Sequence, residues 1–339
     1  MSILINAYCT HSNPDKLNFE HTINNKRDLS DPELADHLNG FQGYILEKGG
    51  QEMSKIKYHL LRHIQRVKHQ FSFNIEDSEL DALAQWALAS NAVLFLTDGT
   101  VRSPTGNVLF YPDGRSPDEN SRIPFLQESY HRRSITEKFF EDRNIPVPNL
   151  PPLPCEHEIE LRTESEIFHR ALALFVVAVR AESLATGEPL EIEAIKERIS
   201  EGFTALSPLE EQFLYSDAYS ENEVVQFAWR YEALLVLLWV MGLVPELPFP
   251  DQICDVPKVA EVVLGWEAWK GNISIRSISE VLDALDQHYR LHWICRQADL
   301  DGRNLPAELD RGVVLERHYA FNWLISFENA DWDEVDTPT

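Results

Sequence analysis

The chain has 339 residues, of which 44% are hydrophobic, so it is long enough for two domains with apolar cores. Its net charge of −25 is uneven: residues 1–135 hold 14 Lys and Arg against 17 Asp and Glu, and residues 136–339 hold 16 against 38. The two segments therefore carry net charges of −3 and −22. This acidity argues against nucleic acid and anionic membranes as partners and favours a basic protein partner, although it can also serve solubility alone.

The sequence carries no signal for a membrane or an oxidising compartment. Its start, MSILINAYCTH, lacks the basic and apolar regions of a signal peptide, and its longest apolar run, residues 233–244, is shorter than the roughly 20 residues of a membrane span. The four cysteines are scattered, without CxxC spacing. We expect a cytoplasmic protein with reduced thiols and no zinc site.

The first 140 residues mix strand and helix signals, which predicts a small α+β domain. Apolar periodicity predicts strands at 3–5, 43–46 and 93–96 and helices over 55–71 and 79–89. The Gly- and Pro-rich run TDGTVRSPTGNVLFYPDGRSP predicts a hairpin with turns at Asp98-Gly99 and Asp113-Gly114. A ferredoxin-like layout is compatible with this mixture.

A proline-rich stretch predicts the boundary between two domains. Residues 146–154 read PVPNLPPLP, and each proline fixes φ and removes a backbone donor, which favours an extended, semi-rigid segment. We therefore predict an α+β domain over 1–140, a linker over 141–158 and a larger all-α helical domain over 159–339.

Helix start signals recur through the second domain. Capping boxes begin at Ser207, Ser220 and Ser277, and Asp255 can cap a shorter helix over 256–264. Another amphipathic helix is predicted over 166–184. We expect six or seven helices, one of them running from the Ser220 box to Gly242.

Charged residues fall on apolar helix faces near the C-terminal end. In the segment LDALDQHYRLHW, Asp286 lies within an apolar face and is spaced i,i+4 from Arg290, which predicts an intrahelical ion pair at the rim of a core. His292 lies at the other edge of that face. Charges among large apolar side chains must be paired, because an unpaired buried charge is very unfavourable.

The last predicted helix, over 313–327, is apolar on nearly every side and should be buried. Glu316 and Arg317 both project onto its apolar arcs, so each needs a partner from another helix. Arg230 and Glu232, on the most apolar helix, are the candidate partners in a buried Arg–Glu network. His318 points about 200° away from Glu316, which argues against a compact catalytic triplet.

Signatures of catalysis or metal binding are weak. His288 and His292 have i,i+4 spacing, but no HExxH glutamate accompanies them and no third ligand is indicated. No Walker loop, GxGxxG or GxSxG motif occurs, and no cysteine is placed beside a histidine. No cofactor is therefore predicted.

Four motifs in the second half, WRYEALLVLLWVMG, LDALDQHYRLHW, VLERHYAFNWL and WDEVDT, occur in a characteristic order. With them the chain resembles the domain-of-unknown-function 4272 family of bacterial proteins over most of residues 140–339. The N-terminal part is similar to an extra domain that some members carry. The resemblance implies a helical domain without an established activity or catalytic residues.

Two functions are compatible with these observations. The first is a non-enzymatic, acidic protein-binding protein of the immunity or antitoxin type that neutralises a basic toxin. The second is a small-ligand or hydrolytic enzyme site in the helical domain, around His292, His318, Asp286 and Arg290. A structural role is the favoured interpretation of these late charged residues. The polar positions, which form either a structural network or a binding site, are Arg230, Glu232, Asp286, Tyr289, Arg290, His292, Glu316, Arg317, His318 and Asn322.

Overall fold

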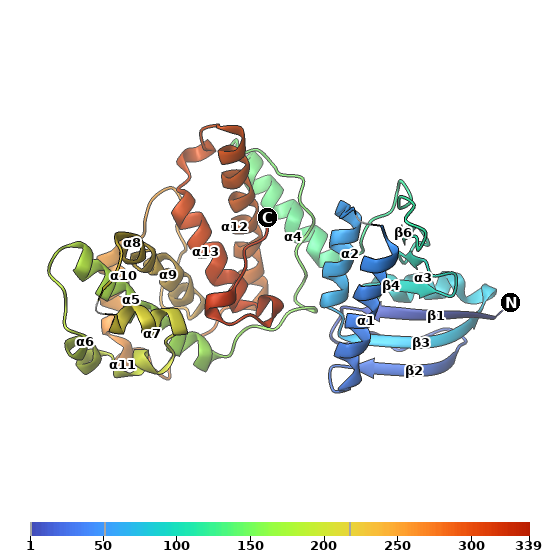
Figure 1. Cartoon of the computed structure of the whole chain (residues 1–339), viewed down its shortest axis with the longest axis horizontal. Coiled ribbons are helices and arrows are strands. Elements are labelled where there is room, and N and C mark those ends of the chain that lie inside the picture. Colours follow the sequence, from blue (N-terminus) through green and yellow to red (C-terminus); the bar gives the residue numbers. More distant parts are fainter. Residues whose placement is uncertain (1, 51, 217) are drawn as a thin grey trace. The chain divides into compact units, whose positions relative to one another are not determined.

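The computed structural model describes residues 2–50, 52–216 and 218–339, which form two compact units (Figure 1). One unit consists of residues 1–131 and 154–159, and the other of residues 132–153 and 160–339. The first combines a sheet with helices and the second is helical, so the predicted α+β class is confirmed. Each unit is described by itself below.

The first unit contains a six-stranded antiparallel sheet in the order β2-β3-β1-β4-β5-β6 (Figure 1). Its strands are β1 (Ser2–Cys9), β2 (Thr22–Asp28), β3 (His69–Glu76), β4 (Ala92–Leu96), β5 (Val101–Arg102) and β6 (Val108–Phe110). Its helices are α1 (Glu33–Lys48), α2 (Lys55–Gln65) and α3 (Leu80–Ala89). The element order differs from the β-α-β-β-α-β order of a ferredoxin-like domain, because β2 precedes two consecutive helices.

Side chains of β1 alternate between two apolar clusters. Tyr8 packs with residues of α1 and α2, including Leu38 and Leu60. Ile5, Ala7 and Cys9 pack with Trp86 of α3. Since successive strand residues face opposite sides of a sheet, α1 and α2 cover one face and α3 covers the other.

Several predictions for this unit are confirmed and two are wrong. The strands at 3–5 and 93–96, the helix over 79–89 and the turn at Gly99 (φ +78°) are present. Residues 43–46 are helical instead, because they continue the buried helical spacing of Leu34, Leu38 and Phe41 in α1. The helix predicted over 55–71 ends at Gln65, and residues from His69 onward belong to β3, whose burial alternates from Phe71. The turn at Asp113-Gly114 follows β6, and the described residues after it form no further strand.

The second unit is built from helices packed around α5 and α9 (Figure 1). They are the part of α4 (Gln127–Glu141) from residue 132 on, α5 (Glu164–Ala185), α6 (Ile192–Arg198), α7 (Pro208–Tyr215), α8 (Glu221–Ala228), α9 (Arg230–Val240), α10 (Val256–Leu264), α11 (Trp266–Trp269), α12 (Ile278–Asp301) and α13 (Arg311–Leu324). α5 packs against α8 and α9, α9 against α13, and α13 against α12. Among the described residues, no helix has the length and apolar character needed to cross a membrane.

The predicted helix starts are confirmed. Capping boxes at Ser207, Ser220 and Ser277 begin α7, α8 and α12, and Asp255 caps α10. The long helix predicted after Ser220 is two helices, because the chain turns at Trp229 between α8 and α9. Together with the unpredicted short helices α6 and α11, this gives more helices than the six or seven expected.

The proline-rich stretch does not form a simple linker. Residues up to 153 belong to the helical unit, and residues 154–159 belong to the first unit. Phe140 and Ile145 are buried against Leu291 and Ile294 of α12 and Val314 of α13. Therefore Ile145, within the predicted linker over 141–158, contributes to the core of the helical unit, together with Phe140 just before it.

Candidate functional site

Two ion pairs join α9 to α13. Arg317 donates from Nε to Glu232 Oε2 at 2.9 Å, and both side chains are almost completely buried. Glu232 also accepts a hydrogen bond from the backbone N–H of Cys254, and Arg317 donates to the carbonyl of Pro248, both at 2.5 Å. In the second pair, Arg230, two residues before Glu232, binds Glu316, the residue directly before Arg317, at 2.9 Å. The four residues that the sequence predicted as a buried Arg–Glu network therefore form two ion pairs between α9 and α13.

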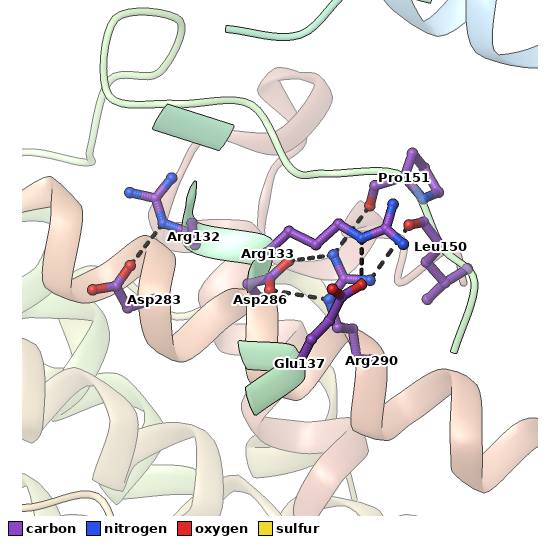
Figure 2. Close-up of polar contacts among 8 residues, drawn as sticks. All are labelled: Arg132, Arg133, Glu137, Leu150, Pro151, Asp283, Asp286 and Arg290. Atoms are coloured by element: carbon purple, nitrogen blue, oxygen red, sulfur yellow. Dashed lines mark hydrogen bonds and ion pairs between the residues drawn. The ribbon is translucent and has the colours of Figure 1, made fainter. Parts of the chain in front are cut away.

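A third ion pair lies within α12. Arg290 binds Asp286 with two hydrogen bonds, Nε to Oδ2 at 3.0 Å and Nη2 to Oδ1 at 2.9 Å (Figure 2). The same guanidinium donates to the carbonyls of Leu150 at 3.5 Å and Pro151 at 3.2 Å. The pair was expected at the rim of the core, but it is fully buried, since the proline-rich stretch covers it.

Two further ion pairs involve arginines of α4. Arg132 of α4 donates to Asp283 of α12 at 2.8 Å, and Arg133 donates to Glu137 within α4 at 2.6 Å (Figure 2). Thus α4, residues 150–151 and α12 are connected by guanidinium groups, and the arrangement is a structural brace in which each acid is bound to an arginine.

His292 of α12 and His318 of α13 meet inside the unit. Their Nδ1 atoms lie 2.9 Å apart, and the ring of Tyr289 is 6.0 Å from that of His318. Burial, followed by the charge of Arg296, lowers the pKa of His292 to about 4. Burial also lowers the pKa of His318 well below its ordinary value, with His292 contributing. Both imidazoles are therefore neutral at pH 7, which makes them poor proton donors there.

The remaining polar candidates have structural contacts. Asn322 of α13 donates to the carbonyl of Asp336 at 2.8 Å. His288 binds the carbonyl of Ala284 at 2.8 Å, and burial lowers its pKa to about 3. Among the described residues, no group of three or more His, Cys, Asp or Glu side chains is arranged to hold a metal ion.

The four cysteines are all buried and free of disulfides. Burial raises the pKa of the Cys295 thiol to about 11 and that of the Cys155 thiol to about 12. The pKa values of Cys9 and Cys254 are also raised by burial. Because the thiolate is the nucleophile, none of these cysteines is suited to nucleophilic catalysis at neutral pH.

An open cleft of about 640 Å³ lies elsewhere in the helical unit. It is formed by the first turns of α5 and α7, the end of α13 and residues 331–334 near the C-terminus. None of the polar positions expected from the sequence lines it.

Tryptophan and arginine side chains form one wall of this cleft. The guanidinium of Arg162 lies 5.2 Å from the ring centre of Trp323, and that of Arg170 lies 4.9 Å from the ring centre of Trp332. The two indole rings contact each other edge to face at 5.5 Å. Arg170 is also ion-paired with the buried Glu210 of α7. Such stacking fixes the guanidinium groups over the rings.

Sequence reasoning identified these residues only in part. Trp332 and Asp333 occur in the WDEVDT motif, and Glu210 was identified as the glutamate of a capping box. Arg170 was not singled out, although it is the charged residue among the buried residues of α5. Its position on the apolar face of the predicted helix is the sequence feature that indicates a functional or structural role for Arg170.

These observations define a helical domain with internal arginine–carboxylate braces and an open aromatic cleft. The pattern of the family described as "domain of unknown function (DUF4272)" matches residues 132–335, more than half of the chain. The chain therefore belongs to this family, and the match begins at the residue where the helical unit begins. No curated protein and no solved structure matches the chain.

Proposed function

We propose that the chain is a non-enzymatic, acidic binding protein that neutralises a basic protein partner, as immunity proteins and antitoxins do. The observation that carries this proposal is the net charge of −22 on residues 136–339. A surface of one sign attracts and steers a partner of the opposite sign, and it accelerates association.

The state of the reactive groups supports binding over catalysis. The buried acids Glu232 and Asp286 are held by arginines, and Glu316 by Arg230. Burial lowers the pKa of His292 to about 4, and burial raises the pKa of Cys295 to about 11. Groups in these states do not exchange protons or attack a substrate readily at pH 7.

The alternative was an enzyme or small-ligand site around His292, His318, Asp286 and Arg290. It has less support, because these side chains are buried and none of them lines the cleft. Asp286 and Arg290 also satisfy each other through two hydrogen bonds.

The test is co-purification with the basic products of neighbouring reading frames, followed by calorimetric titration at increasing salt. We expect one such product to bind and the affinity to fall steeply between about 0.05 and 0.5 M salt, as the Debye length shortens. Lysozyme, a basic protein unrelated to the neighbours, serves as the control for non-specific attraction. A complex whose affinity does not change with salt, or lysozyme binding as tightly as the best neighbour, would overturn the proposal, as would the absence of any binding neighbour.

A further inference from the structure

The first unit holds a short segment that the sequence placed in the linker. Residues 154–159 belong to the first unit, whereas residues 153 and 160 on either side of them belong to the helical unit. The family pattern over 132–335 includes this segment. A piece of the family's own sequence is therefore bound by the unit that lies almost wholly outside the pattern.

Glu158 is the side chain by which the segment is bound. Its Oε1 accepts hydrogen bonds from Thr10 Oγ1 at 2.7 Å and from Asn91 Nδ2 at 2.9 Å. Thr10 directly follows β1, and Asn91 directly precedes β4. Both of these residues are completely buried, and Glu158 is 5% exposed. Because a carboxylate loses its hydration on burial, it needs such donors, and Thr10 and Asn91 form a site for it.

A positive charge also acts on this carboxylate. Burial lowers the pKa of the Arg66 guanidinium, and the charge of Glu158 opposes that shift. Arg66 lies at the C-terminal end of α2, so a third element of the first unit contributes to the site. Two neutral donors and a cation together favour a carboxylate over an amide or an apolar side chain.

The backbone of the segment is bound as well. The N–H of Ser12 donates to the carbonyl of His157 at 2.8 Å, and the rings of His11 and His157 stack with their centres 4.8 Å apart. The segment forms a turn, in which the N–H of Glu158 donates to the carbonyl of Cys155 at 3.0 Å and the N–H of Cys155 donates to Glu158 Oε2 at 2.9 Å. Because these internal hydrogen bonds close the turn, less conformational freedom is lost when it binds.

The apolar packing of the first unit does not use this segment. Among the described residues, the two apolar clusters on the faces of the sheet contain positions between 3 and 125 only. Cys155 is buried but belongs to neither cluster. The sheet and its helices therefore pack with one another without the segment, as a binding domain packs without its ligand.

From these contacts we infer that the first unit is a peptide-binding module, whose ligand is a tight turn bearing a glutamate, and that residues 155–158 occupy its site in cis. Since module and ligand are in one chain, the effective concentration of the ligand is on the order of millimolar, and the turn excludes competing peptides. The inference concerns a different unit from the acidic segment on which the proposed function rests, and it does not depend on that function.

The experiment uses the full chain under reducing conditions and a labelled peptide with the sequence of residues 153–160. In the wild type the site is occupied, and Glu158→Ala vacates it. A second variant combines Glu158→Ala with Asn91→Asp, which replaces a donor by a carboxylate and tolerates the positive φ of +47° at this position. The matched control combines Glu158→Ala with Asn24→Asp, because Asn24 is exposed on β2 and the chemical change is the same.

Fluorescence anisotropy measures the affinity of each chain for the peptide. We expect Glu158→Ala to bind it at least about tenfold more tightly than the wild type, since the cis turn no longer competes. Adding Asn91→Asp should weaken this binding by about tenfold or more, and adding Asn24→Asp by less than about twofold. Equal binding by the wild type and Glu158→Ala, or equal effects of the two asparagine substitutions, would overturn the inference.

Two altered peptides test which carboxylate is recognised. With Glu158→Ala as the receptor, a peptide carrying Gln in place of Glu158 should bind about tenfold more weakly than the unaltered peptide. A peptide carrying Gln in place of Glu156 has the same net charge and should bind less than about twofold more weakly. Equal weakening of both peptides would contradict a site specific for Glu158.

Hydrogen exchange of the full chain tests whether the turn is a ligand or a part of the core. In Glu158→Ala, exchange should accelerate at the amides of Ser12 and residues 155–158, while β1 and β3 stay as protected as in the wild type. Loss of protection in β1 and β3, or failure of the variant to fold, would mean that the turn is an integral part of the unit, and the inference would be wrong.

Discussion

At the residue scale, the late charged side chains act as internal braces. Arg317 and Glu232 are almost wholly buried, and each makes a further hydrogen bond to a backbone group. A buried ion pair contributes little net stability compared with an apolar pair, but removing one partner leaves a charge in an apolar surrounding. The function of these pairs is therefore to fix how α9 and α13 pack.

Replacing Arg317 with methionine should destabilise the helical unit strongly. Because the Glu232 carboxylate loses the ion-pair partner that it has among the described residues, we expect the free energy of unfolding to fall by about 3–5 kcal/mol. Urea denaturation followed by circular dichroism measures this change.

Two further variants make the test specific. Combining Arg317→Met with Glu232→Gln removes the uncompensated charge and should recover part of the loss. Arg303→Met affects an exposed pair with Asp301 and should change stability by less than about 1 kcal/mol. If Arg317→Met and Arg303→Met had the same effect, the brace interpretation would be wrong.

The histidine pair predicts how stability depends on pH. The pKa of His292 is lowered from 6.5 to about 4 and that of His318 lies well below 6.5, so the unfolded chain binds more protons than the folded chain below pH 6.5. Stability should therefore fall as the pH falls from 6.5, by up to about 1.4 kcal/mol per pH unit for each histidine. For His292, the loss of stability is complete near pH 4, because its pKa in the folded protein is about 4.

The variant His318→Asn isolates this contribution. It removes one titrating group, so its urea midpoint should fall less steeply than that of the wild type between pH 6.5 and 5. The difference in urea midpoint between the wild type and the variant at pH 7.5 is the reference value. Parallel curves for wild type and variant would show that His318 does not titrate in this way.

At the element scale, local signals set where helices begin. Ser277 accepts a hydrogen bond from the N–H of Glu280 and forms a complete capping box, as the sequence predicted for α12. The other end of α12 depends on Gly302, which has φ +62° in the left-handed region. Because a side chain is strained there, this residue is the natural stop for the helix.

Replacing Gly302 with alanine should reduce stability by about 1 kcal/mol, because alanine is unfavourable at positive φ. No atom lies within 4 Å of an added Cβ, so a steric clash does not contribute. Gly302→Asn is the matched control, since asparagine tolerates this conformation better. Thermal unfolding compares the three proteins, and an alanine variant as stable as the wild type would contradict the expectation.

Errors in predicting elements arose where short runs were considered apart from their neighbours. Residues 43–46 are apolar and β-like in isolation, yet they extend a helix whose buried face begins at Leu34. Ser220 is correctly predicted as a helix start, but the turn at Trp229 is not, because the residues around it, VVQFAWRYEALL, include no Gly or Pro that would mark a break. Tertiary packing overrides local preference at such places.

At the scale of the whole molecule, the position of the proline-rich stretch decides the domain boundary. The carbonyls of Leu150 and Pro151 accept hydrogen bonds from Arg290, and Phe140 and Ile145 are buried within the helical unit. The helical unit consequently needs residues that precede the predicted start at 159.

A fragment of residues 132–339 should therefore be more stable than one of residues 159–339. The shorter fragment loses the burial of Phe140 and Ile145, each contributing about 1.5–3 kcal/mol, and leaves the Arg290 guanidinium without its two carbonyl acceptors. Circular dichroism and urea denaturation of both fragments measure the difference. If the two fragments unfolded at the same urea concentration, residues 132–153 would not stabilise the helical unit.

The sequence alone determined the α+β class, the capped helix starts and the need for partners of Glu316 and Arg317. These properties follow from periodicity, from short-range hydrogen bonding and from the unfavourable burial of an unpaired charge, all of which are local. Only the tertiary structure decided that Arg230 binds Glu316 while Arg317 binds Glu232. It also decided that Arg170 and Trp332, far apart in the chain, form one wall of a cleft. Helix packing sets such distances, and no single segment contains the information that fixes how two segments pack.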